Sequence, residues 1–251
     1  MSGHSKWATI KRKKGKTDAE RGKLFTRLIK EITVAAREGG GDPEGNPRLR
    51  TAIATAKSGN MPQDNIKRAI LKGTGQLPGV TYESITYEGY GPGGVALLFE
   101  VFTDNRNRVV ADIRHTLTKY GGNLGANGCV AWMFDKKGVI TVDLEAADED
   151  TLMEVAMDHG AEDINSDVGA YEITMSPEVL DDVRTAIEAK GITIASAEVT
   201  MVPQSQTKLV KENEASSMLK MLDLFEDQDD IQKVYSNFDI DESLLEKLAQ
   251  G

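Results

Sequence analysis

The residues with the clearest chemical potential are cations near the N-terminus. Residues 1–17 hold six Lys or Arg side chains and no Asp or Glu, and these cations are Lys6, Lys11, Arg12, Lys13, Lys14 and Lys16. Because a block of like charge repels itself, we expect it to be mobile until anions neutralise it. Nucleic acid supplies closely spaced phosphates for that purpose. Trp7 lies inside the block, where it either packs on the helices that follow or stacks on an exposed base.

A second candidate contact lies in the segment Asp104-Asn105-Arg106-Asn107-Arg108. It places two arginines at the expected start of a helix, where the helix dipole disfavours cations. Residues that break a local rule can mark function. Arg106 and Arg108 therefore either contact a polyanion or are surface arginines paired with nearby carboxylates, and both readings stay open.

Two glycine-containing patterns resemble nucleotide-binding loops but lack the required context. Gly89-x-Gly91-x-x-Gly94 formally matches the dinucleotide fingerprint, yet Pro92 interrupts it and a strand, not a helix, is expected to follow. We read this segment as the turn of a hairpin. Lys14-Gly15-Lys16-Thr17 would need an upstream glycine where Ile10 stands, so a phosphate-binding loop is not expected there.

Other catalytic or metal-binding signals are weak. His4, His115 and His159 are scattered and no Cys-x-x-Cys occurs, so no zinc site is proposed. Cys129 is most simply a small buried residue, and His159 is expected at a helix end. The carboxylates at 145–163 and 223–230 are interpreted as solvated helix faces. We therefore expect a non-enzymatic protein with no cofactor, no metal and no evident small-molecule substrate.

The net charge of −10 hides a strong segregation of charge. Residues 1–75 hold 17 Lys and Arg against 7 Asp and Glu, whereas residues 76–251 hold 13 against 33. Such asymmetry indicates a nucleic-acid partner for the first region, with a solvated basic face as the ordinary alternative.

The overall composition is typical of a globular protein of two or three domains, with 251 residues, 39% hydrophobic and 28% charged. No apolar run approaches the roughly 18 residues of a membrane helix, and no apolar core follows the charged N-terminus as in a secretory signal. The single cysteine excludes an intramolecular disulfide and fits a reducing compartment. We expect a cytoplasmic protein that is not associated with a membrane.

Three helices are expected in residues 1–75. Thr17 and Glu20 form a capping box for the first helix, whose apolar face is Leu24, Phe25, Leu28, Ile29, Ile32 and Ala36, with Lys23, Arg27, Lys30 and Arg37 nearly opposite. Asn46 caps a second helix that ends at Gly59. A third helix starts near Pro62 and directs outward Lys67, Arg68 and Lys72. The region is predicted to be a basic helical nucleic-acid-binding domain.

The remaining chain alternates between strand and helix patterns. Strands are expected at 81–90, 95–103 and 129–134, with a helix capped by Asp104 or Asn105 and ending at Lys119. Residues 137–202 follow the ferredoxin-like order, with pieces at 138–144, 149–159, 161–167, 170–175, 178–190 and 192–201. A tail helix near 214–226, a strand over 231–238 and a short helix from Asp241 complete the middle unit. We predict an α+β fold in which residues 76–136 and 203–251 form a discontinuous α/β domain around the inserted domain 137–202.

Several dispersed motifs together resemble the YebC family. The first is the opening run Met1–Ala8, continued by Ile10-Lys11 and Lys13–Lys16. The others are Asn60-Met61-Pro62, Tyr87–Gly94, Thr103–Arg108 and Tyr235–Phe238. The resemblance extends from Gly3 to about Ala249, and motifs so dispersed are specific when taken together.

The resemblance implies a helical N-terminal domain and two α/β domains around a cleft. It also implies regulation of gene expression, because the family is described as DNA-binding transcriptional regulators. Its mitochondrial relatives are translational activators, and bacterial members are linked to the ribosome and to relief of stalled elongation. The polyanionic partner that these descriptions share agrees with the charge segregation.

DNA and ribosomal RNA both stay open as the partner. A basic arm that folds on binding, together with Trp7, favours RNA, whereas a basic helical domain favours DNA. Two weaker alternatives are a hydrolase in the cleft and a protein-interaction adaptor that is indifferent to Lys11–Lys14. The candidate contact residues are Lys6, Trp7, Lys11, Arg12, Lys13, Lys14, Lys16, Lys23, Arg27, Lys30, Arg106 and Arg108.

Overall fold

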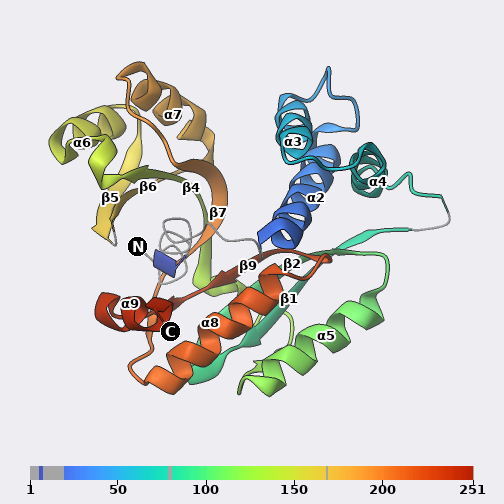
Figure 1. The fold of residues 1–251 in the computed structure, drawn as a ribbon. Coiled ribbons are helices and arrows are strands. Elements are labelled where there is room, and N and C mark those ends of the chain that lie inside the picture. Colours follow the sequence, from blue (N-terminus) through green and yellow to red (C-terminus); the bar gives the residue numbers. More distant parts are fainter. Residues whose placement is uncertain (1–5, 8–19, 79–80, 168, 251) are drawn as a thin grey trace.

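The computed structural model describes residues 6–7, 20–78, 81–167 and 169–250 of the 251-residue chain. Within these ranges, no helix is long and apolar enough to cross a membrane. An N-terminal helical unit is followed by two antiparallel sheets with helices packed on them (Figure 1). The α+β class expected from the sequence is confirmed.

Three helices form the N-terminal unit: α2 (Glu20–Gly39), α3 (Pro47–Ser58) and α4 (Gln63–Gly73). Apolar side chains at helical spacing meet in their shared core, among them Leu28, Ile32, Leu49 and Ile66. A Cβ atom on Gly73 would lie 2.4 Å from the carbonyl oxygen of Thr33. A glycine at this position therefore allows α4 to pack closely against α2.

The predicted start of α3 at Asn46 is confirmed. The Asn46 side-chain oxygen accepts a hydrogen bond from Leu49 N at 3.0 Å, and Pro47 is the first helical residue. The Asn46 amide also donates to the carbonyl oxygens of Ala35 at 2.8 Å and Gly40 at 2.9 Å. One side chain, only 4% exposed, thus joins the end of α2 to the start of α3.

The other predicted helix starts have different outcomes. Pro62 precedes α4 as its N-cap residue, as expected. Asn105 caps α5 (Arg106–Lys119), and its side-chain oxygen accepts from Arg108 N at 3.0 Å. Thr17 of the predicted capping box lies outside the described residues, and α2 is described from Glu20 onward.

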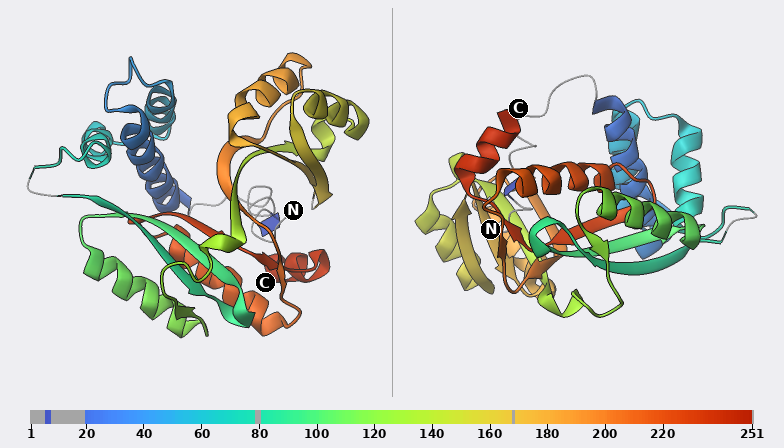
Figure 2. Two further views of the ribbon diagram at one scale, coloured as in Figure 1. Left: turned by 180° about the vertical axis from the view of Figure 1, so that it is seen from behind. Right: turned by 90° about the horizontal axis from the view of Figure 1, so that it is seen from below.

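The middle sheet is antiparallel and has the strand order β3-β1-β2-β9. Its strands are β1 (Glu83–Tyr90), β2 (Ala96–Thr103), β3 (Asn123–Leu124) and β9 (Ile231–Ser236). The helices α5 and α8 (Glu212–Glu226) lie side by side over one face of this sheet (Figure 2). Strand β9 joins this sheet from the C-terminal part of the chain by pairing with β2.

Strand β2 is buried on both faces of the middle sheet. On one face Phe99 meets Phe225 of α8 edge to face, with ring centroids 4.8 Å apart. On the other face Leu98 packs in a second cluster with Phe134 and Tyr235. This double burial explains why the strand appears in the sequence as a continuous apolar run.

The third unit follows the predicted strand and helix order. Its elements are β4 (Phe134–Asp143), α6 (Glu149–Asp158), β5 (Ala161–Asp167), β6 (Ala170–Met175), α7 (Leu180–Ala189) and β7 (Ser196–Pro203). The strands form an antiparallel sheet in the order β5-β6-β4-β7, and residues of α6 and α7 share one core with it. The ferredoxin-like arrangement is confirmed. In Figure 1 this unit and the N-terminal helices stand above the middle sheet, with α5 and α8 below it.

The C-terminal strand differs from its predicted form because Asn237 interrupts it. Its side-chain oxygen accepts from Ala96 N at 2.7 Å and its amide donates to Ser205 O at 3.2 Å. The chain therefore leaves β9 at Ser236 and continues as β10 (Phe238–Asp239), which pairs with β8 (Thr207–Lys208). The last helix, α9 (Glu242–Gln250), follows.

The strand predicted over residues 129–134 is wrong. Residues Ala131–Met133 form a short 3-10 helix, η2, and β4 begins only at Phe134. The cause is the buried carboxylate of Glu88, which accepts hydrogen bonds from Val130 N and Ala131 N. These backbone groups are consequently directed at a side chain instead of a neighbouring strand.

Asn46 provides a test of the joint between α2 and α3. Asn46→Ala should lower the free energy of unfolding by about 2 kcal/mol, because it removes the cap and the two hydrogen bonds that the side-chain amide donates to the carbonyl oxygens of Ala35 and Gly40. Urea unfolding followed by circular dichroism measures this loss. Lys57→Ala, an exposed change in α3, is the control and should stay within about 0.5 kcal/mol of the parent. A loss from Asn46→Ala no larger than the control's would contradict the role.

Candidate nucleic-acid interface

The predicted contact residues differ in how much of them the structure describes. Lys11, Arg12, Lys13, Lys14 and Lys16 lie outside the described residues. The backbones of Lys23 and Arg27 belong to α2, while their side chains are outside the description. Predictions for these residues therefore stay predictions, and the geometry concerns Lys6, Trp7, Lys30, Arg106 and Arg108.

Lys6 and Trp7 are anchored on the C-terminal part of the chain. Lys6 Nζ lies 3.0 Å from Asp239 Oδ1, and both side chains are largely buried. Trp7 is 9% exposed and belongs to the core that α5, α8 and β9 share. In Figure 1 this short segment lies near α9 and not beside α2. In this structure the Trp7 ring has no free face for a base, and it packs on the middle unit instead of the helices that follow it.

The described part of the predicted basic face of α2 is turned toward the middle unit. Lys30 Nζ donates to the carbonyl oxygen of Glu226, the last residue of α8, where the helix dipole favours a cation. Arg37 donates to Ser84 Oγ at 3.2 Å, and its guanidinium lies 5.1 Å from the centre of the Phe102 ring. The outward orientation predicted for these two side chains is wrong, because β1, β2 and α8 offer them partners.

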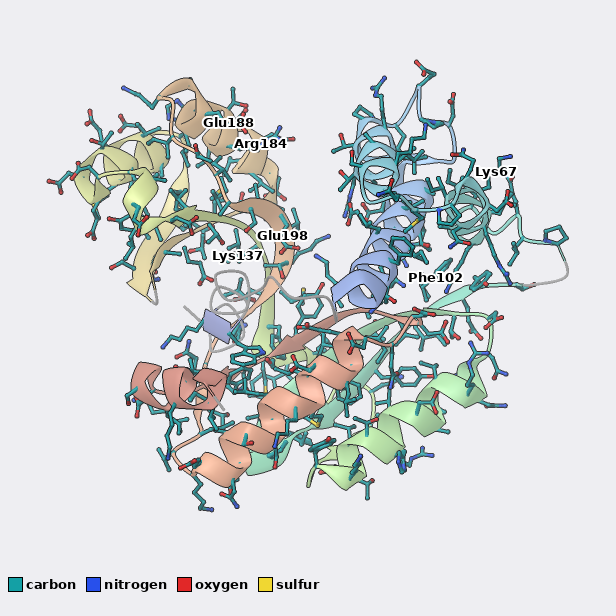
Figure 3. All side chains as sticks on the ribbon, in the orientation of Figure 1. Lys67, Phe102, Lys137, Arg184, Glu188 and Glu198 are labelled. Carbon is teal, nitrogen blue, oxygen red and sulfur yellow. The ribbon has the colours of Figure 1, made fainter. Side chains whose placement is uncertain are left out.

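The exposed cations of the helical unit lie on α3 and α4. Lys57, Lys67 and Arg68 are exposed, and no ion pair joins them to another residue in the described ranges. Figure 3 shows Lys67 at the outer edge of the helical unit. The outward direction predicted for Lys67 and Arg68 is thus confirmed, and it gives this unit a solvent-facing basic surface.

Lys72 and Arg108 meet at one carboxylate between the helical and middle units. Arg108 Nη2 lies 2.7 Å from Asp104 Oδ1 and 2.6 Å from Asp230 Oδ2. Hydrogen bonds to Asp230 and Asp104 raise the pKa of the Arg108 guanidinium. Lys72 Nζ lies 3.5 Å from Asp230 Oδ1 and 5.1 Å from the centre of the Tyr82 ring. Lys72 was expected to point outward, but it instead joins the two units.

The two arginines at the start of α5 are therefore different. Arg108 is paired with the carboxylates of Asp104 and Asp230, as in the second reading given for these arginines, and the pairs offset the unfavourable helix dipole. Arg106 is exposed and makes no ion pair within the described ranges. Of these two arginines, Arg106 is therefore the one whose charge is available to a polyanion.

A groove of about 600 Å³ lies beside this junction, between α4 and α5. Both signs of charge line its walls. The positive side chains are Arg68, Lys72 and Arg108, and the negative ones are Asp104, Asp112, Asp229 and Asp230. A site for phosphates needs an excess of cations. The mixed walls do not provide that excess, so the groove is not assigned to the nucleic-acid interface.

Glu88 on β1 is a functional candidate that the residue patterns did not single out. Its carboxylate is 5% exposed and accepts hydrogen bonds from Gly128 N at 2.5 Å, Val130 N at 2.7 Å and Ala131 N at 2.8 Å. Burial raises the pKa of Glu88, but hydrogen bonds from these N–H groups and from Cys129 outweigh it, so the pKa is lowered. The sequence does contain a signal for this residue: Glu88 is an acidic residue inside the predicted strand over residues 81–90.

The loop that Glu88 holds also fixes the environment of Cys129. The thiol is half-buried, and burial raises its pKa, so it is protonated near neutral pH and is not an activated nucleophile. His159 caps α6, and its ring Nδ1 lies 2.8 Å from Val155 O, as expected for a helix end. Within the described ranges, no three His, Cys, Asp or Glu side chains gather to hold a metal ion.

The two arginines of α5 give a paired test. Arg108→Ala should lower the free energy of unfolding by about 1 kcal/mol, since it removes two partly exposed ion pairs. Arg106→Ala should change it by less than about 0.5 kcal/mol, because the side chain is exposed. Urea unfolding of both variants measures the difference. Equal losses would mean that the Asp104 and Asp230 pairs contribute nothing to stability.

Glu88 gives a pH-dependent test. Glu88→Gln should cost about 2 kcal/mol at neutral pH, because it removes the charge that three backbone donors face. The folded pKa lies below the ordinary glutamate value of about 4.3, so this contribution is complete above that value and is lost as the pH falls through the folded pKa. The difference in unfolding free energy between parent and variant should hold down to about pH 5 and narrow below about pH 4. A difference independent of pH would contradict the role of the charge.

The chain is similar to known proteins along its whole length. The family model described as "TACO1/YebC protein N-terminal domain" matches residues 5–76, and that described as "TACO1/YebC second and third domain" matches residues 82–238. A protein of Desulfotalea psychrophila named "Probable transcriptional regulatory protein" is 60% identical over 250 residues, 100% of each chain. A protein of Syntrophus aciditrophicus with the same name is 58% identical over 250 residues, 99% of this chain and 100% of that one.

A solved structure agrees with the fold. The crystal structure of a conserved hypothetical protein from Aquifex aeolicus superimposes with a TM-score of 0.75 at 48% identity, covering 90% of this chain and 93% of that one. The N-terminal family model covers the helical unit, and the model of the second and third domains covers the middle sheet and the third unit. The family expected from the motifs is therefore confirmed: the chain belongs to the TACO1/YebC family.

Proposed function

We propose that this chain is a non-enzymatic regulator of gene expression that binds nucleic acid through residues 1–75. The observation that carries the proposal is the segregation of charge, with 17 Lys and Arg against 7 Asp and Glu in that region of an otherwise acidic chain. Relatives named "Probable transcriptional regulatory protein" support the regulatory role. Duplex DNA is the first candidate partner.

The proposed contacts fall into two groups. The first is the basic arm and the start of α2, with Lys11, Arg12, Lys13, Lys14, Lys16, Lys23 and Arg27. The second is formed by exposed side chains without ion pairs in the described ranges, Lys57, Lys67, Arg68 and Arg106. Lys6, Trp7, Lys30 and Arg108 have intramolecular contacts, so we assign them to holding the units in place.

The rest of the chain orients the bound nucleic acid. We assign residues 76–136 with 203–251 to one discontinuous domain and 137–202 to a domain inserted in it. Residues 76–251 hold 33 Asp and Glu against 13 Lys and Arg, which repels phosphates from that part of the surface. Binding from one side follows, and we expect it in the cytoplasm.

A second candidate function is that of a translation factor bound to ribosomal RNA. The observation that favours it is Trp132, which is 68% exposed. RNA presents unpaired bases in loops and bulges, which stack on exposed aromatic rings, whereas the bases of duplex DNA are already stacked on one another.

The arm is tested by removing its charge. Changing Lys11, Arg12, Lys13 and Lys14 together to Gln should lower the slope of log affinity against log salt by up to about 3.6, because each phosphate contact on duplex DNA contributes about 0.9. Fluorescence anisotropy with a labelled 20-base-pair duplex at several salt concentrations measures the slope.

The matched control removes four cations from the acidic part of the chain. Lys190, Lys208, Lys211 and Lys220 are exposed on that part, and changing them to Gln alters the net charge equally. This variant should keep the parent's slope. If the arm variant also keeps it, the arm does not contact the phosphates.

The same duplex complex also separates the two candidate functions. Purified ribosomes are added as competitor at fixed physiological salt, with unlabelled duplex as the reference competitor. Displacement by ribosomes at concentrations far below those of the duplex would favour the translation factor. A complex that resists ribosomes would favour the transcriptional regulator.

A further inference from the structure

Trp132 is an exposed tryptophan in a chain that has only two. Its side chain is 68% exposed, whereas that of Trp7 is 9% exposed. It belongs to η2, at the end of the loop that joins β3 to β4. The residue patterns singled out Trp7 as a candidate contact, but the exposed tryptophan ring is that of Trp132, in the loop before β4.

The Trp132 ring is held by the chain itself. Its Nε1 donates to the carbonyl oxygen of Cys129 at 3.2 Å. The same oxygen accepts from the hydroxyl of Tyr90 at 3.2 Å, which ties it to β1. The edge of the indole is therefore occupied, and its face is the part left to a ligand.

The loop before Trp132 is also fixed. The buried Glu88 carboxylate accepts from Gly128, Val130 and Ala131, and Gly125 N donates to Glu88 O at 2.8 Å. A Cβ on Gly125 would lie 2.4 Å from Cys129 Sγ, so the loop packs tightly on itself. A site ordered before binding avoids the entropy cost of ordering it on binding.

The surroundings of Trp132 decide which kind of partner fits. Among the described residues, the other large apolar side chains that are exposed are Leu144, Met153, Met157, Val210 and Leu224, and each lies at least 12 residues away along the chain. The exposed residues next to it in the sequence are small or polar, namely Ala126, Asn127, Gly128, Asp135 and Lys136. A protein interface has a core of several apolar residues. The two residues that flank Trp132, Ala131 and Met133, are half-buried against the cluster that contains Phe134 and Tyr235. Trp132 is therefore the one large apolar side chain that this loop exposes, and one fixed ring fits one flat ligand better than a protein interface.

We infer that Trp132 is a stacking platform for an unpaired base of the nucleic acid, and that Glu88 is the residue that positions it. The inference rests on the second candidate function, in which the nucleic acid is RNA with unpaired bases, and it adds a contact on the acidic part of the chain. Stacking needs no charge on the protein, so it is compatible with the acidic surroundings. The basic region then binds phosphates while Trp132 takes up a base that is free of its pairing partner.

The experiment uses the full chain and a labelled 12-nucleotide single-stranded RNA of mixed sequence. Trp132→Ala should weaken its binding by about 5-fold to 150-fold, the range for one stacked base. Trp132→Phe, which keeps a smaller ring, should lose less. The same RNA annealed to its complement should bind parent and variants equally. Val210→Ala removes another exposed apolar side chain and should change neither affinity.

Fluorescence reports on the ring directly. Single-stranded RNA should quench the emission that is present in the parent and absent in Trp132→Phe, while the buried Trp7 is unaffected. Glu88→Gln should lower the fluorescence anisotropy of Trp132 at a temperature where the variant is folded, because the loop is released. A purely structural role of Glu88 would leave that anisotropy unchanged.

The outcomes separate this inference from the proposed function. Unchanged single-strand affinity in Trp132→Ala, with an arm-dependent salt slope still present, would overturn the stacking site alone. Loss of binding to a ribosomal protein without loss of RNA affinity would make Trp132 a protein contact and would also overturn it. If the parent binds no nucleic acid at all, both proposals fail together.

Discussion

The carboxylate of Asp230 is the interaction on which the arrangement of the units depends. This carboxylate pairs with Lys72 of α4 and with Arg108 of α5. The backbone oxygen of Asp230 also accepts a hydrogen bond from Phe102 N at 2.8 Å, which extends the pairing of β2 and β9. Lys72 and Asp230 are each 15% exposed, so solvent screens this pair less than a surface pair. One residue thus connects the helical unit, the helix layer and the sheet. The direction in which the basic surfaces of the first unit face follows from that connection.

Much of the fold could be predicted from the sequence because the decisive signals are local. The cap at Asn46, the helix ends and the alternation of elements after Phe134 each depend on a few neighbouring residues. The strand predicted at 129–134 was wrong for the opposite reason. The backbone there is bound by Glu88, some 40 positions earlier, and no pattern within residues 129–134 records such a partner.

The candidate site was predicted less well, because a basic side chain does not indicate what it faces. Lys30, Arg37 and Lys72 looked like outward cations by helical periodicity, yet each has a partner on the middle unit. Periodicity predicts which side of a helix is polar, but a polar side can also lie against another polar surface. Trp7 shows the same limit: its place in a charged run left open whether it packs on the chain or stacks on a base, and the core that buries it comes from residues 87–245. Exposure at Trp132 likewise depends on the folded loop.

The segregation of charge gives buried ion pairs and exposed cations, which salt affects to different degrees. Lys6 and Lys72 of the basic region bind carboxylates of the acidic region, which holds the chain's two ends and its units together. Lys57, Lys67 and Arg68 are exposed, and in the proposed function they bind external anions. Screening acts mainly on exposed charges, because counterions reach them, and much less on pairs that are mostly buried. In the proposed function, moderate salt should therefore release the bound polyanion before it loosens the units, so that a salt-dependent loss of binding would report on the interface and not on unfolding.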